Sequence, residues 1–244
     1  MISVLFLGLL FGMKHAMEAD HVAAVASLAT RSSSPAEAAR FGIAWGLGHT
    51  ITLFVFGSAV LLLGLTIPAT MAHGLELAVG VMLVLLGADV VRRMWKQGLH
   101  IHPHKHGSER HLHLHDHAPA KAAVPHAPVP HAHVPHAHTH KRTLPMRALC
   151  VGLVHGMAGS AALVLLTLGT IESVWLGVAY IALFGLGSIG GMMALSFAIG
   201  LPLRLTAHKL GSLYSGLTAA IGLLTIFLGA SIVWDIGVTQ GLLF

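Results

Sequence analysis

The chain has 244 residues, of which 55% are hydrophobic and only 9% are charged. Soluble domains carry about a quarter charged residues. This composition therefore excludes an ordinary soluble globular protein and indicates an integral membrane protein. The formal net charge of +5 counts all 20 histidines as neutral, and a single cysteine, Cys150, excludes an internal disulfide.

Six apolar windows are long enough to cross a bilayer as helices, which takes about 20 mostly apolar residues each. Their length and uniform hydrophobicity favour helices over the short alternating strands of a membrane barrel. Because apolar segments continue to the end of the chain, we expect the first window to be a retained span and not a cleaved signal. The predicted spans cover roughly residues 2–30, 40–65, 70–94, 146–170, 173–202 and 213–235.

The first predicted span contains five ionisable residues in the stretch KHAMEADH at 14–21. Ionisable side chains at membrane depth are costly and generally face a pathway or a partner. A regular helix turns about 100° per residue, so His15 and His21 share one side while Asp20 points away. Two arrangements remain open: the helix is distorted here, or Asp20 orients a metal-bound histidine without binding the ion itself.

Other polar residues of the first half have simpler expected roles. Lys14 and Glu18 are four residues apart, so we expect them to pair and neutralise each other. In the third span, Glu76 has no assigned role. Asp89 is close enough in sequence to Arg92 and Arg93 to form an ion pair with them.

Three motifs recur in the same order at nearly constant spacing. GMKHAMEAD at 12–20 resembles GLVHGMAGS 140 residues later, GLGHT resembles GLGSI after 139, and VGVMLVLLGAD resembles IGLLTIFLGAS after 142. This pattern predicts two homologous halves of three spans each. Because three is odd, the second half would cross the membrane in the opposite direction, an inverted repeat typical of secondary transporters.

The predicted halves, residues 1–95 and 145–244, are joined by a linker at 96–144 that holds 14 of the 20 histidines. Its prolines and lack of an apolar pattern predict a disordered segment. Histidine-rich tracts bind borderline metals such as nickel, cobalt, zinc and copper. The alternative is a low-complexity spacer without a role in binding.

The distribution of lysine and arginine predicts the orientation. Thirteen of the 14 basic residues lie in or beside the loops near 31–40, 95–145 and 203–212, and the fourteenth, Lys14, lies inside the first span. Basic loops remain in the cytoplasm. We therefore expect a multi-pass protein of the cell (inner) membrane with both termini outside and the histidine-rich linker in the cytoplasm.

The candidate metal ligands combine imidazoles with a carboxylate, a set that suits a borderline divalent ion. The first half supplies most of them. In the second half, Ser160 stands at the position of Asp20 and Ser188 at the position of His49. A buried polar network that merely joins helices is the alternative. The candidates are His15, Asp20, His21, His49 and His155.

KHAMEADHVAAV resembles the signature of the nickel/cobalt transporter (NiCoT) superfamily, R-H-A-x-D-A-D-H-I, and LGHTITL at 47–53 resembles its second motif, L-G-H-[ST]-T-V. The resemblance implies a metal path through His15, Asp20, His21 and His49. Lysine replaces the arginine, glutamate replaces the first aspartate, and HGMAGSAAL stands in place of a later carboxylate motif. With the family's usual first helix also missing, the chain is more similar to the urease-accessory-type branch.

These observations predict a secondary transporter for Ni²⁺ and/or Co²⁺, with uptake slightly favoured over efflux, and not an enzyme. No cofactor is expected, because the metal is the substrate. The expected partners are the divalent ion, the lipid bilayer and cytoplasmic metallochaperones, and no nucleic acid. No phosphate-binding loop signature is present, so coupling to ATP would need another subunit.

Three alternatives remain. The same site could serve efflux of nickel or cobalt, or the protein could deliver metal without transporting it. An intramembrane metal-dependent hydrolase could hold zinc with an open position, although no H-E-x-x-H motif is present.

Overall fold

The computed structural model describes residues 2–64, 68–96, 100–106, 109–115, 145–156 and 173–241. Within these residues the chain forms seven α-helices, one π-helical turn and two short strands. Four helices are long and apolar enough to cross a membrane, and the chain is a membrane protein. The elements are α1 (Ile2–His15), α2 (Ala19–Ala29), α3 (Pro35–Leu63), α4 (Ala69–Lys96), β1 (His100–His106), β2 (Glu109–His115), α5 (Met146–His155), α7 (Val174–Lys209), α8 (Gly211–Trp234) and η1 (Asp235–Thr239).

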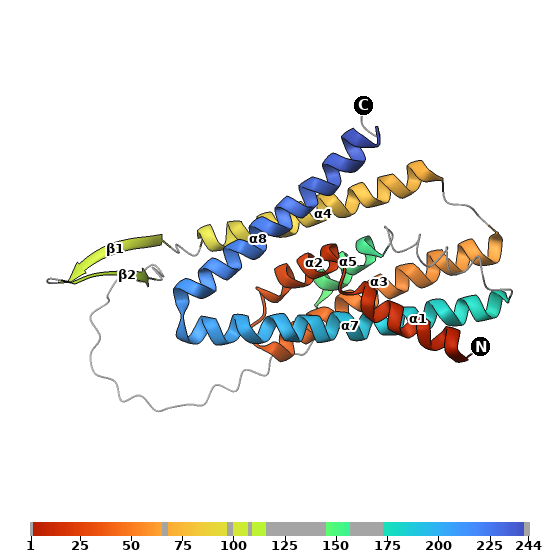
Figure 1. Ribbon diagram of the computed structural model, residues 1–244, viewed down its shortest axis with the longest axis horizontal. Coiled ribbons are helices and arrows are strands. Elements are labelled where there is room, and N and C mark those ends of the chain that lie inside the picture. Colours follow the sequence, from red (N-terminus) through yellow and green to blue (C-terminus); the bar gives the residue numbers. More distant parts are fainter. Residues whose placement is uncertain are drawn as a thin grey trace, which may run out of the picture.

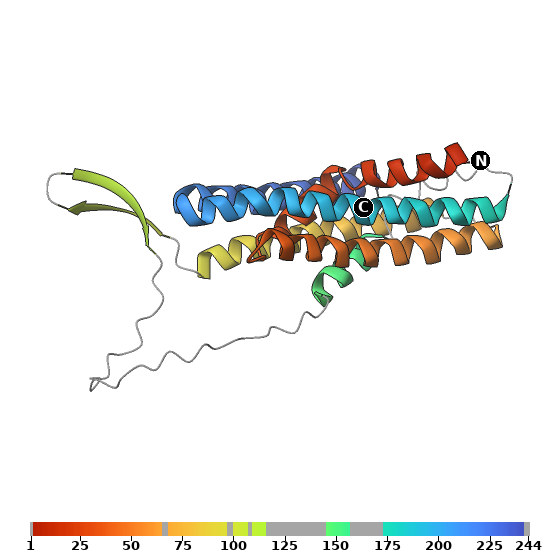
Figure 2. The same cartoon turned by 90° about the horizontal axis from the view of Figure 1, so that it is seen from below.

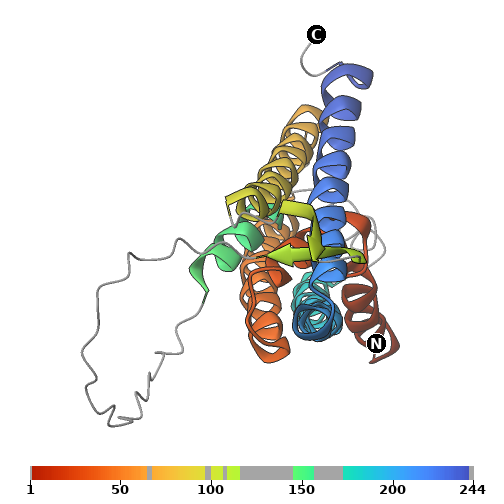
Figure 3. The ribbon, with the colours of Figure 1, turned by 90° about the vertical axis from the view of Figure 1, so that its left-hand side faces the viewer.

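The long helices form two packed pairs, α3 with α7 and α4 with α8 (Figures 1 and 3). The short helix α1 packs on α7, and α5 packs on α3. Helix α2 lies in the middle and contacts all four long helices, which explains why most of its residues from Ala24 to Ala29 are buried. The assembly is thus a helix bundle with one short helix enclosed at its centre.

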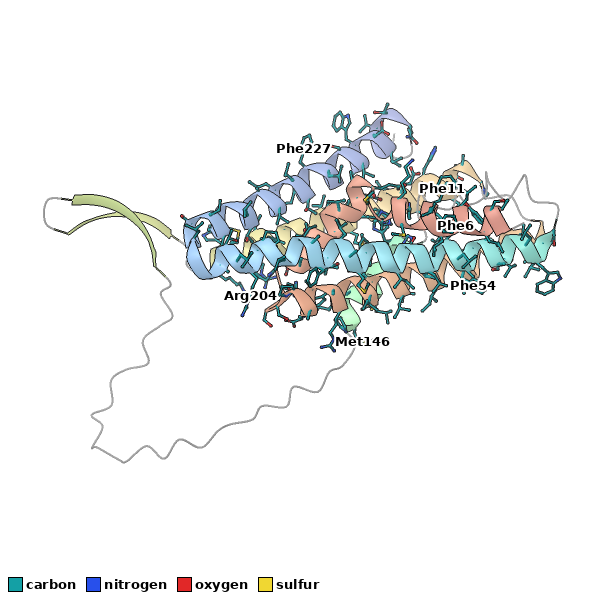
Figure 4. The ribbon with its side chains drawn as sticks, turned by 60° about the horizontal axis from the view of Figure 1, so that its bottom comes forward. Phe6, Phe11, Phe54, Met146, Arg204 and Phe227 are labelled. Atoms are coloured by element: carbon teal, nitrogen blue, oxygen red, sulfur yellow. The ribbon has the colours of Figure 1, made fainter. Side chains whose placement is uncertain are left out.

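The outer surface of the bundle is apolar. The rings of Phe6, Phe11, Phe54 and Phe227 point away from the ribbon (Figure 4), and that of Phe227 is 70% exposed. A lipid bilayer covers such a surface at no cost, whereas exposed apolar patches of this kind are rare on soluble monomers. The surface therefore agrees with the membrane class that the composition predicts.

The first predicted span is broken in the middle. Helix α1 ends at His15, and α2 begins at Ala19 after Glu18, whose backbone is extended (φ −65°, ψ 150°). Of the two arrangements that the sequence leaves open for this stretch, the distorted helix is thereby confirmed. The fourth predicted span begins as α5, which ends at His155, and the remainder of that window lies outside the described residues.

Helix α1 packs against α7 in the same way as α5 packs against α3. A Cβ atom on Gly12 would overlap the carbonyl of Phe184, and one on Gly152 would overlap the carbonyl of Trp45. Small residues let helix backbones approach this closely in membranes. Close backbone contacts of the same kind join Gly187 to Leu9 and Gly48 to Leu149. Glycines also face each other between α4 and α8, Gly80 with Gly229 and Gly87 with Gly222.

Adding a methyl group at Gly152 should destabilise the bundle. We expect Gly152→Ala to lower the free energy of unfolding by about 1–3 kcal/mol, the usual cost of overpacking. Gly216→Ala is the matched control, because no atom lies within 4 Å of a Cβ built there. Thermal unfolding of both purified variants in detergent checks this. Equal midpoints would contradict the close approach of α5 to α3.

The histidine-rich linker differs in part from the predicted disorder. Strands β1 and β2 pair antiparallel, and the register places His100 opposite His115, His102 opposite His113 and His104 opposite His111. The reason is the alternation of histidine with other residues, which has the period of two typical of a strand. Residues 116–144 lie outside the described part, so disorder there stays a prediction.

Candidate metal centre

The structure brings all five predicted ligands together at the broken first span. His15 is the last residue of α1 and His155 the last of α5, while Asp20 and His21 lie in the first turn of α2 and His49 lies within α3. All four imidazoles are buried, with at most 3% of each residue exposed. The ends of two short helices thus converge on the middle of a long one.

His21 lies at the centre of this cluster. Its ring centroid is 4.2 Å from those of His15 and His155 and 5.2 Å from that of His49. Ligand atoms of His15, His21 and His49 all lie within 4.8 Å of one another, and the same holds for Asp20, His21 and His155. These separations allow the side chains to hold one metal ion.

Asp20 bridges two of the imidazoles. Its Oδ1 lies 2.9 Å from Nδ1 of His21, and its Oδ2 lies 3.1 Å from Nε2 of His155. An ionised carboxylate can only accept hydrogen bonds, so both ring nitrogens must donate to it. The proton of each ring is thereby assigned, and the lone pairs of His21 Nε2 and His155 Nδ1 are available. Orienting carboxylates of this kind are common beside metal-bound histidines.

Several ring nitrogens in the cluster have no hydrogen-bond partner among the described residues. They include Nε2 of His15, Nε2 of His21, both nitrogens of His49 and Nδ1 of His155, all buried. Buried polar atoms nearly always form hydrogen bonds, so a group of buried nitrogens without partners indicates a binding position for a ligand. Four imidazoles, each with an available nitrogen, form a donor set suited to a borderline divalent ion.

Two aromatic rings that the motif analysis missed support the imidazoles. Trp45 of α3 lies 5.4 Å from the ring of His21 and 5.3 Å from that of His155, and Phe184 of α7 lies 5.4 Å from the ring of His15. Trp45 precedes His49 by four residues, so its place on the same helix face could have been predicted. No sequence signal pointed to Phe184, because its role depends on how α1 packs on α7.

The predicted pairing of Lys14 with Glu18 is wrong. Instead, Oε1 of Glu18 lies 2.9 Å from Nδ1 of His15, although the angle is not that of a hydrogen bond. The physical reason is the end of α1 at His15: a spacing of four residues puts two side chains on one face only within a continuous helix.

Asp89 forms the ion pair with Arg93 that the sequence suggests, at 2.9 Å, and a second one with Arg31. Arg93 also donates a hydrogen bond to Oγ1 of Thr30 at 2.9 Å. These contacts fasten the C-terminal end of α2 to α4.

Comparison with known proteins places this site in a family. The chain is 34% identical to the urease accessory protein UreH of Bacillus sp. (strain TB-90) over 242 residues, which are 99% of this chain and 95% of that protein. The chain belongs to the UreH family. This relationship confirms the urease-accessory-type branch to which the motif departures point. Searches with family models and against solved structures gave no match.

Proposed function

We propose that this UreH-family protein is a secondary transporter that moves Ni²⁺ and/or Co²⁺ across the cytoplasmic membrane, with uptake slightly favoured over efflux. The observation that carries the proposal is the cluster of four buried imidazoles with unpartnered nitrogens. The resemblance of KHAMEADH and LGHT to nickel/cobalt transporter motifs and the relationship to a urease accessory protein both support nickel.

The chemistry of the donors supports a borderline ion over a hard one. Imidazole nitrogens suit nickel, cobalt, zinc and copper, whereas magnesium and calcium prefer shells of oxygen ligands. Asp20 adds one negative charge beside the rings and offsets part of the cost of bringing a divalent ion into the membrane. Because protons compete with metal for imidazole, coupling to a proton gradient suits this site.

The packing supports two inverted halves, residues 1–95 and 145–244. His15 and His155 occupy equivalent positions of the repeated G-x-x-H motif, and each ends a short helix. In Figures 1 and 2, α1 and α5 run in roughly opposite directions along the bundle. Secondary transporters commonly place their site where such halves meet at broken helices.

The arrangement of basic residues supports a cytoplasmic linker. The strands β1 and β2 lie at one end of the bundle, and both chain termini lie away from that end (Figure 1). Arg31, Arg93 and Arg204 belong to the helix ends nearest the linker, as expected for a cytoplasmic face. On this proposal, the histidine-rich linker holds metal in the cytoplasm, where metallochaperones would exchange it.

Transport by purified protein in sealed liposomes tests the proposal. The parent should carry radioactive nickel into the vesicles at a rate that excess cobalt reduces and excess magnesium does not. The matched control carries His15→Ala and His21→Ala together and should be inactive. Nickel binding without transport would instead indicate a delivery protein. Lower nickel content of expressing cells would indicate efflux by the same site.

A metal-dependent hydrolase has one observation in its favour, because the carboxylate of Glu18 lies beside His15 and could act as a base. Catalytic zinc sites, however, keep one coordination position open. Four imidazoles with unpartnered nitrogens converge here from α1, α2, α3 and α5, a donor-rich arrangement that favours binding and release of an ion over hydrolysis.

A further inference from the structure

A cavity of about 360 Å³ opens beside the histidine cluster. Buried histidines line its base, namely His21 and His155, and their Nε2 and Nδ1 atoms have no hydrogen-bond partner among the described residues. Four carboxylates also line it, those of Glu18, Asp20, Glu76 and Asp235, together with apolar side chains of α4, α8 and η1. The cavity therefore joins unpartnered metal-binding atoms to a set of negative charges.

The described lining of this cavity is rich in acidic side chains. Neither lysine nor arginine is among the described residues that line it. Asp235 accepts a hydrogen bond from the neutral amide of Gln240 at 3.1 Å, and no ion pair of Glu76 is found within the described part of the chain. A cleft lined by one sign of charge raises the local concentration of counter-ions and their rate of binding.

The cavity extends towards the end of the bundle that is remote from the β-strands. Glu76 lies in the second turn of α4, and Asp235 begins the π-helical turn η1 after α8. Both lie near the helix ends that are remote from the β-strands (Figure 1). Asp235 is exposed, Glu76 is half-buried and the imidazoles are buried. The cavity thus has exposed carboxylates at Asp235 and Glu18 and buried imidazoles beside them.

Other cavities lie at the opposite end of the bundle, beside the C-terminal end of α2. Two smaller cavities there, of about 30 and 100 Å³, have no histidine in their lining. Asp89 forms ion pairs with Arg31 and Arg93 at this end, and these pairs join the end of α2 to α4. Within the described residues, the cavity that reaches the metal cluster extends towards the end of the bundle with Asp235.

We propose that this cavity is the vestibule through which the divalent cation reaches the histidines from outside the cell, and that Glu76 and Asp235 capture the cation there. The proposal rests on the transport function proposed above. Carboxylate oxygens attract a hydrated divalent ion without requiring it to lose all its water. The imidazoles at the base then replace the water, because nitrogen donors bind nickel and cobalt more tightly than oxygen donors do.

The first test separates capture from binding at the cluster. In cells that take up radioactive nickel, the double variant Glu76→Gln, Asp235→Asn should raise KM by about tenfold, at the low end of the effect of charged clefts on association. The maximal rate should remain that of the parent, because the histidines are intact. Added salt should raise the KM of the parent more than that of the variant. Glu109→Gln, in strand β2, is the control for losing an acidic residue elsewhere.

The second test distinguishes charge from shape. Asp235→Cys in a Cys150→Ala background should react with membrane-impermeant thiol reagents added outside the cells, since Asp235 is exposed. A reagent carrying a sulfonate should restore the KM of the Cys150→Ala parent, and one carrying a trimethylammonium group should raise KM further. The Cys150→Ala protein alone should respond to neither reagent.

Three outcomes would overturn the vestibule. A double variant with the KM of the parent would remove the capture role while leaving the transporter intact. Equal effects of the two reagents would show that bulk matters and charge does not. If the folded parent moved no nickel at all in cells or liposomes, the transport function and the vestibule would both fall.

Discussion

Replacing His21 by alanine should abolish nickel transport and reduce nickel affinity by more than about 100-fold. Loss of a residue that only orients a ligand costs about 10–100-fold, and a direct ligand should cost at least as much. His21 is the strongest candidate because its ring is 1% exposed and lies 4.2 Å from two other imidazoles. Calorimetric titration of purified protein with nickel, together with uptake into liposomes, measures both effects.

A matched control separates loss of a ligand from loss of any histidine. His73 is half-buried on α4 and does not line the cavity, so His73→Ala should bind and transport nickel like the parent. Because His21→Ala also leaves a hole in the packed core, His15→Ala and His49→Ala are needed as independent variants. If all three single variants kept the affinity of the parent, the cluster would be structural and the transporter proposal would lose its main support.

The identity of the ligands could be predicted from the sequence, but their geometry could not. His15 and His21 stand out because charged or polar residues inside an apolar window need a reason, and His155 is found through the repeat. A regular helix would turn Asp20 away from His15. The break at residues 16–18 lets Asp20 turn towards the histidines. The sequence AME contains neither proline nor glycine, so this break could not be predicted from it.

Residues that act across helices were only partly predictable from one sequence: the spacing of Trp45 from His49 offered a signal, whereas nothing pointed to Phe184. Trp45 and Phe184 hold the imidazoles through contacts between α3, α7 and the short helices. Glu76 and Asp235 line one cavity only because α4 and α8 pack side by side. The glycine repeats that allow this packing are visible in the sequence, but nothing in them says which helix each glycine faces.

Conversely, the packing of α1 on α7 and of α5 on α3 explains the short repeated motifs. The repeated G-x-x-H places a glycine one turn before the histidine that ends each short helix, so the helix can approach a long one closely there. In the second half, Ser188 replaces His49 and its hydroxyl donates to the carbonyl of Gly12 at 3.2 Å. One half therefore uses this position for a candidate ligand, and the other uses it for packing.

The replacement Asp20→Asn should lower nickel affinity by about 10–100-fold while leaving the amount of folded protein unchanged. The carboxylate accepts from His21 and His155 together. An amide of the same shape can accept from only one ring and must donate to the other. That second ring would then carry its proton on the nitrogen that faces the cluster, and the cluster would lose one lone pair.

A double-mutant cycle tests this mechanism directly. If Asp20 acts by orienting His155 and His21, the affinity losses of Asp20→Asn and His155→Ala should overlap and sum to less than their separate effects. Asp116→Asn, in the linker, is the control and should bind nickel like the parent. Strictly additive losses would show that Asp20 binds the ion independently of His155. An unchanged affinity in Asp20→Asn would show that the bridge has no role in holding metal.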